Sequence, residues 1–125
     1  MINIIALASE GIVYFIVILL LLTGTFFLVV GTIGLLRFPD FYTRMHATGK
    51  CDTLGQGLVL IGLTIFAFYS RYLLNNTSYF FVGIKILFII TFIFIANPTA
   101  THAIARAAYN SGVKLWTVQE GKDSE

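Results

Sequence analysis

The chain has 125 residues, of which 58% are apolar and only 11% are charged, and its formal net charge at pH 7 is +2. The apolar residues form unbroken blocks, which excludes an ordinary soluble domain and indicates a single integral membrane domain. So small a net charge gives no support for a nucleic-acid partner, and none is predicted. A lone cysteine, Cys51, excludes an internal disulfide, and its charged neighbours Lys50 and Asp52 predict a polar loop position without a role of its own.

Three blocks without internal charge, apart from one lysine, predict an all-α membrane domain over residues 1–112 with three transmembrane helices. The expected spans are about 11–36, 53–71 and 80–106. The first block alone provides about 39 Å of helix, whereas the hydrocarbon core of a bilayer is about 30 Å thick. Residues 113–125 are predicted to form a polar cytoplasmic tail.

Small residues in the first block predict a close helix contact. Gly24 and Gly31 are seven positions apart and therefore fall on one helical face. Because small residues allow helices to approach each other closely in lipid, we expect this face to pack against a partner helix.

The segment between the first two blocks concentrates charge, with Arg37, Asp40, Arg44, Lys50 and Asp52 within sixteen positions. Each such side chain costs on the order of 2.5–3.5 kcal/mol at a bilayer centre, so the segment should lie at the water boundary. Pro39 suits the first turn of a helix, which predicts a short interfacial helix from Pro39 to Thr48, ending at Gly49. Asp52 or Thr53 would then cap the second span.

The third block contains two unusual residues. Lys85 is either a functional intramembrane residue or, since it lies near the outer end, a side chain that snorkels outward. Pro98 should kink the helix and leave the carbonyl of Phe94 without its usual donor, with Thr99 or Thr101 available to relieve the loss. The helix should continue through His102 to Tyr109.

Positive charges predict the orientation. The first connection carries Arg37, Arg44 and Lys50, and the C-terminal segment carries Arg106, Lys114 and Lys122, whereas the second connection has only Arg71 with Lys85 nearby. Since cytoplasmic segments carry an excess of Lys and Arg, the N-terminus is expected outside and the C-terminus in the cytoplasm.

No catalytic or metal-binding motif is present in the sequence. His46, Cys51 and Asp52 are too few for a four-ligand zinc site, so no metal and no cofactor are predicted. His46 and His102 are either hydrogen-bonded interfacial side chains or proton carriers. All six carboxylates lie outside the spans or at their margins, which argues against a carrier that works alone and favours a subunit of a larger assembly.

Two motifs resemble a known family. The string from Gly34 to Ala47, GLLRFPDFYTRMHA, followed by Lys50 and by Asp52 to Gly55, is similar to the signature of the G subunit of Mrp-type multisubunit Na+/H+ antiporters. The string from Asn97 to Tyr109, NPTATHAIARAAY, is similar to the end of that family's third span. The family usually has Ala-Thr-Lys where this chain has Ala47-Thr48-Gly49-Lys50, and Cys51 departs as well, but the charged residues keep their places.

The resemblance implies a small subunit of a prokaryotic plasma membrane complex, with no catalytic activity alone. It would pack beside other small subunits and large antiporter-like subunits, which carry the intramembrane ionisable residues missing here. The family also includes equivalent subunits of membrane-bound hydrogenases and related complexes, so a redox-driven complex is one alternative. An independent small transporter is another.

Our hypothesis for the site is that residues 37–52 dock the subunit at the cytoplasmic face and shape an ion entrance. Asp40 and Asp52 would attract Na+, whereas Arg37, Arg44 and Lys50 would balance them or bind anionic headgroups. The alternative is that salt bridges merely hold the loop. His46 completes the candidate residues there, and Lys85, Pro98 and His102 are the candidate positions within or beside the third span.

Overall fold

The computed structural model describes residues 2–113, with side chains described from residue 9, and in that part the chain forms three helices. They are α1 (Ile2–Arg37), α2 (Phe41–Leu74) and α3 (Thr77–Asn110). All three are long and apolar enough to cross a membrane, which confirms the predicted all-α membrane fold. Each extends beyond its predicted span, and the proposed tail begins where the described residues end.

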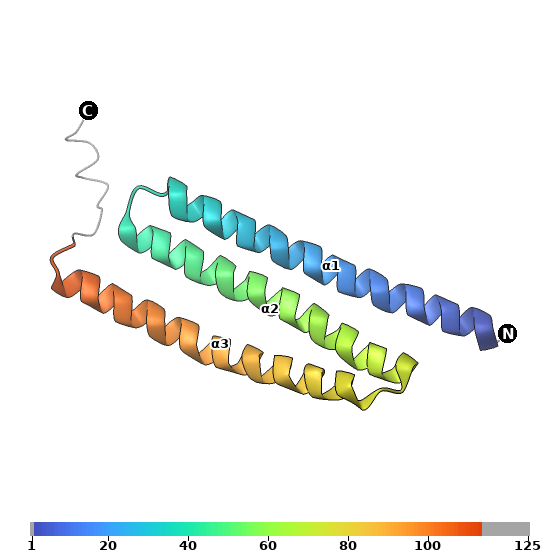
Figure 1. Cartoon of the computed structure of the whole chain (residues 1–125). Coiled ribbons are helices and arrows are strands. Elements are labelled where there is room, and N and C mark those ends of the chain that lie inside the picture. Colours follow the sequence, from blue (N-terminus) through green and yellow to red (C-terminus); the bar gives the residue numbers. More distant parts are fainter. Residues whose placement is uncertain (1, 114–125) are drawn as a thin grey trace.

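The helices lie in a single layer with α2 in the middle (Figure 1). Within the described residues, α2 packs against both neighbours, whereas α1 and α3 make no contact with each other. The layer encloses almost no core, since Val17 and Ala67 are the only buried apolar side chains among residues 9–113. In lipid this is physically reasonable, because helix association there depends on close packing and hydrogen bonds rather than on removing apolar surface from water.

The predicted interfacial helix was wrong. Residues 41–74 form one uninterrupted helix that passes through Gly49. A glycine inside a helix costs about 1 kcal/mol relative to alanine, but here the turn around Gly49 lies against Thr101 of α3, 3.6 Å from where a Cβ would stand. Packing against α3 therefore outweighs the tendency of the helix to end at Gly49.

The predicted cap of the second span was also wrong. The N-cap of α2 is Asp40, whose Oδ2 accepts a hydrogen bond from the backbone N–H of Thr43 at 3.2 Å. Asp52 and Thr53 lie more than two turns inside the helix. The Thr53 hydroxyl donates to the carbonyl of Gly49 at 2.7 Å, and Asp52 accepts from Gln56.

The contact between α1 and α2 depends on two glycines that face each other. A Cβ at Gly24 would stand 2.7 Å from the carbonyl oxygen of Gly55, and a Cβ at Gly55 would stand 2.8 Å from that of Gly24. Gly31 lies on the same face and meets Cys51. The prediction that Gly24 and Gly31 mark a close helix contact is confirmed, and the partner is the next helix of the chain. Cys51 is consequently part of a helix contact, not of a polar loop.

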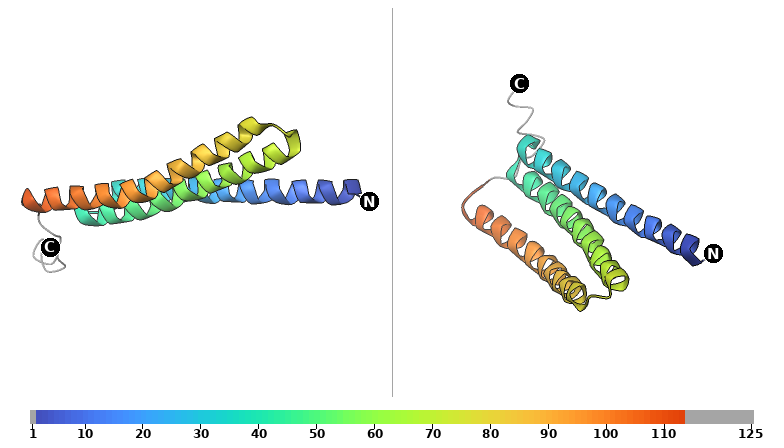
Figure 2. Two further views of the ribbon diagram at one scale, coloured as in Figure 1. Left: turned by 90° about the horizontal axis from the view of Figure 1, so that it is seen from below. Right: turned by 45° about the vertical axis from the view of Figure 1, so that its right-hand side comes forward.

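α3 continues through Pro98 and bends along its length, as the left view of Figure 2 shows. Thr99 donates its hydroxyl hydrogen to the carbonyl of Ile95 at 2.9 Å, and Thr101 donates to that of Asn97 at 2.9 Å. The prediction that one of them would serve the carbonyl of Phe94 was therefore wrong. The two hydroxyls instead donate to the carbonyls of Ile95 and Asn97, and neither reaches that of Phe94.

The end of the layer opposite to Arg37 is rich in aromatic contacts. Tyr14 of α1 packs edge-on against Tyr69 of α2, with ring centroids 5.9 Å apart, and Arg71 lies over the ring of Phe80 at 4.5 Å. The left-handed Asn75 then ends α2, and Asn76 caps α3 by accepting from the N–H of Ser78. Such aromatic side chains are typical of a membrane–water interface. The exposed Lys85 lies two turns into α3 from this end.

We predict that Gly55→Ala weakens the α1–α2 contact, because its Cβ meets backbone that cannot move without separating the helices. The expected loss is about 1–3 kcal/mol in the free energy of unfolding, typical of overpacking. Gly57→Ala is the matched control, since its Cβ would meet only the ring edge of Phe94 at an ordinary 3.7 Å. Denaturant titration in mixed micelles, followed by energy transfer between labels on α1 and α2, measures both. Equal losses in the two variants would contradict the assigned contact.

Candidate functional site

The six residues predicted between the first two spans lie at one end of the layer. Arg37 is the last residue of α1, Asp40 caps α2, and the others follow in its first three turns. Tyr42 joins this end to α3 by donating a hydrogen bond to the carbonyl of Val113 at 3.2 Å. The end is therefore held by the cap of α2 and by a hydrogen bond from α2 to the residues that follow α3.

Two of the six residues have local structural roles. Asp40 caps α2, and the Arg44 side chain donates from Nε to the carbonyl of Phe38 in the connection between α1 and α2. Among the described residues, neither takes part in an ion pair. The loop is thus fixed by bonds to backbone groups, and the alternative of salt bridges holding it is not what the described residues show.

Lys50 and Asp52 diverge around α2. Two helical positions correspond to about 200° of rotation, so these side chains lie on nearly opposite sides of the helix. Lys50 is exposed, as is His46 one turn before it. Asp52 is half-buried, and its Oδ1 accepts a hydrogen bond from Gln56 Nε2 at 2.7 Å. One broad side of the layer therefore carries positive charge at this height and the other carries the carboxylate.

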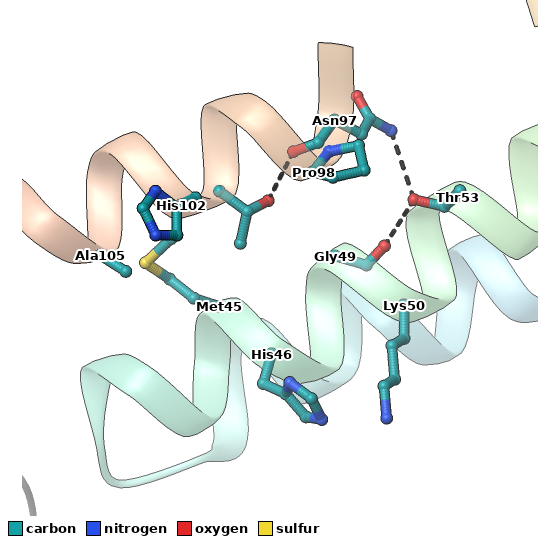
Figure 3. A pocket seen from close by; sticks show the side chains of 10 residues that line it. Met45, His46, Gly49, Lys50, Thr53, Asn97, Pro98, His102 and Ala105 are labelled. Carbon is teal, nitrogen blue, oxygen red and sulfur yellow. Dashed lines mark hydrogen bonds between the residues drawn. The ribbon is translucent and has the colours of Figure 1, made fainter. Parts of the chain in front are cut away.

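A pocket of about 350 Å³ lies between the first half of α2 and the second half of α3 (Figure 3). It brings together four predicted residues, His46, Lys50, Pro98 and His102. Arg37, Asp40, Arg44, Asp52 and Lys85 do not line it. The complete lining is Met45, His46, Gly49, Lys50, Thr53, Asn97, Pro98, Thr101, His102 and Ala105.

A chain of hydrogen bonds crosses the pocket from one helix to the other. Asn97 Nδ2 donates to Thr53 Oγ1 at 3.4 Å, and Thr53 in turn donates to the carbonyl of Gly49. On the α3 side, Thr101 donates to the carbonyl of Asn97 (Figure 3). The pocket lining therefore has amide and hydroxyl groups where Thr53, Asn97 and Thr101 meet. The bond between Asn97 and Thr53 was not predicted from the sequence, although an amide inside an apolar span is a signal for a hydrogen bond between helices.

The two histidines have different surroundings in the pocket. Figure 3 shows His102 directed toward the sulfur of Met45, whereas His46 and Lys50 extend from the other side of α2. Nowhere in the described part do three His, Cys, Asp or Glu side chains gather closely enough to hold a metal ion. The residues that line the pocket carry hydroxyl, amide, imidazole and amine groups.

Comparison with known proteins identifies the family. Residues 20–109, which include the loop, the pocket, the second half of α1 and nearly all of α2 and α3, match the family model described as Na+/H+ antiporter subunit. The chain belongs to the G-subunit family of these antiporters. It is 42% identical over 95 residues to the G subunit of the Na+/H+ antiporter of Alkalihalophilus pseudofirmus, a match that covers 76% of this chain and 73% of that protein.

Other relatives extend the comparison to archaea. A UPF0091 protein of Pyrococcus horikoshii is 39% identical over 94 residues, covering 75% of this chain and 82% of its own length. Among solved structures, a chain of the membrane-bound sulfane sulfur reductase, an archaeal respiratory membrane complex, is 37% identical with a TM-score of 0.71. That match covers 88% of this chain and 96% of the other. Chains similar to this one therefore occur in a Na+/H+ antiporter and in a respiratory membrane complex.

We predict that the two contributions of Asp40, its charge and its cap, can be separated. Asp40→Asn should leave the stability of α2 nearly unchanged, because Asn caps a helix as well as Asp does, whereas Asp40→Ala should lower it by about 1 kcal/mol. Unfolding titrations of the two variants in micelles measure the difference. If both variants lost equal stability, the carboxylate charge rather than the cap would be what α2 requires.

Proposed function

We propose that this chain is a non-catalytic, path-lining subunit of a larger ion-exchanging membrane complex in the plasma membrane of a prokaryotic cell. The observation that carries the proposal is the thin layer of helices. Three helices in a row, with α1 and α3 out of contact, cannot surround an ion pathway alone. The described carboxylates nearest to that layer, Glu10, Asp40 and Asp52, also leave its central turns without an acidic residue.

The orientation proposed from the positive charges puts the pocket at the cytoplasmic side. Arg37, Arg44 and Lys50 lie at the same end of the layer as the C-terminus of α3, and Arg71 lies at the other. An excess of positive residues at the pocket end favours the cytoplasm. In that arrangement the N-terminus of α1 is outside and the exposed Lys85 extends toward the outer boundary.

Na+ and H+ are the ions we propose for the complex, with lipid around the uncovered helices and no resident cofactor. The support is the family, whose members include a named Na+/H+ antiporter subunit. For the entrance at residues 37–52, the local bonds of Asp40 and Arg44 favour structural roles for those two residues. Asp52, His46, Lys50 and His102 are then the groups most able to meet an ion.

Two parent complexes are compatible with this role. One is an antiporter of the kind named for the Alkalihalophilus relative, and the other is a redox-driven complex such as the sulfane sulfur reductase, whose chain has the same fold. A tagged copy purified from native membranes separates them. Soluble redox subunits among the copurified proteins would support the redox-driven complex. Large antiporter-like subunits without soluble redox subunits would support the antiporter.

The subunit role itself is tested in vesicles. We expect liposomes with only this polypeptide to show no exchange of Na+ for H+, while liposomes with the purified complex do. The readout is acidification or alkalinisation of the lumen after an imposed Na+ gradient. Exchange by the lone polypeptide would overturn the proposal and leave the independent transporter as the better account.

The ion entrance is tested by removing charge without removing the cap. On the entrance hypothesis, Asp52→Asn should reduce Na+/H+ exchange by the intact complex several-fold, because an unpaired carboxylate beside an ion entrance concentrates cations. Asp40→Asn should have a smaller effect, since its carboxylate is directed at the start of α2. Unchanged exchange in both variants, with the complex intact, would remove the entrance hypothesis while leaving the subunit role in place.

A further inference from the structure

Three polar residues form a stripe along α2, here called the acid stripe: Thr48, Asp52 and Gln56, each four positions from the next. Its direction is fixed by the neighbouring contacts. Cys51 faces Gly31 of α1, and Thr53 faces Asn97 of α3. Since each helical residue turns about 100°, Asp52 lies midway between these two contacts, on a broad side of the layer.

The acid stripe has more acceptors than donors available. Gln56 gives one of its amide hydrogens to Asp52 Oδ1, which leaves Asp52 Oδ2 and Gln56 Oε1 on the same side of α2. No lysine, arginine or histidine of the described chain forms an ion pair with Asp52, and Lys50 is on the opposite side. The carboxylate therefore has an amide partner but no cation.

Thr48 adds an independent irregularity at the end of the acid stripe. Eight threonines of the helices donate to the carbonyl four residues earlier, among them Thr53 and Thr64. Thr48 Oγ1 is buried and has no hydrogen-bond partner within the described residues. Because this oxygen is covered by atoms of the chain itself, it offers no bond to a docking partner, and the free acceptors of the acid stripe are those of Asp52 and Gln56.

The depth of the acid stripe makes a cation the favoured partner. Asp52 immediately precedes the uncharged residues 53–70, and Gln56 lies one turn inside them. At this inner margin of the bilayer an ionised carboxylate is expensive unless it is paired. An arginine or lysine supplies both the positive charge and the N–H donors that the two free oxygens lack.

The family membership supplies the kind of molecule that would carry this cation. A solved chain with the same fold is part of a respiratory membrane complex, and the helices of this chain leave the stripe side of α2 uncovered. We propose that the acid stripe docks a transmembrane helix of a neighbouring subunit, with an arginine or lysine near its cytoplasmic end paired to Asp52. The proposal rests on the subunit role argued above, and it replaces the entrance role for Asp52, because a carboxylate paired to a neighbouring cation does not attract Na+.

Photo-crosslinking tests the docking without touching the stripe. A benzophenone amino acid replaces Leu63, which lies about 20° from the direction of Asp52, or Ile61, about 180° away at almost the same depth. Both are exposed apolar residues of α2. In the intact complex, position 63 should crosslink to a transmembrane segment that carries a lysine or arginine on its cytoplasmic side. Position 61 should not crosslink to that segment.

Charge exchange then tests the pairing itself. Asp52→Lys should lower the amount of the neighbouring subunit that copurifies with the tagged chain at least tenfold, and Asp52→Glu should leave that amount unchanged. Replacing the basic residue of the crosslinked partner by an acidic one should restore copurification with Asp52→Lys. Crosslinks from position 63 only to lipid, only to a second copy of this chain, or to a helix without a basic residue would each overturn the proposal. If the unaltered chain copurified with no other subunit, the subunit role itself would fail first.

Discussion

The fold depends on one constraint, the position of α2 between two helices that do not touch each other. Every contact of the layer is consequently a contact of α2, with Gly24 against Gly55 on one side and Asn97 against Thr53 on the other. The first contact requires the absence of a side chain, and the second is a hydrogen bond. Close packing and hydrogen bonds are main ways to hold helices together in lipid, because apolar surface gains little by leaving a hydrocarbon solvent.

The central position of α2 also explains where its polar residues face. With two sides occupied by neighbours, two sides remain open, and the sequence places Lys50 on one and Asp52 on the other. Charges that are two positions apart in the chain therefore reach different surroundings. The two sides of the layer therefore carry opposite charges at the same height. Charged groups at a membrane margin are stabilised by partners, which neighbouring subunits can supply.

Much of this could be predicted from the sequence, and the two wrong predictions at the start of α2 share one cause. Block length and charge gave the number of helices, and the spacing of Gly24 and Gly31 gave the helix contact. The same local reasoning ended a helix at Gly49 and began the next at Asp52 or Thr53, where the structure has one continuous helix. Gly49 is a weak helix former on its own, but the chain around it packs against α3 as a regular helix, and that contact is invisible in a local pattern.

The sequence by itself determined the class of the protein, because long uncharged segments must be buried in a bilayer and charged segments must reach water whatever the packing. It also determined the family, since the strings from Gly34 to Ala47 and from Asn97 to Tyr109 are distinctive in their residues. Only the tertiary structure decided that His46, Lys50, Pro98 and His102 border one pocket while Asp52 faces away from Lys50. These relations depend on which helix stands beside each face of α2 and on α2 running unbroken through Gly49, and a local sequence pattern shows neither.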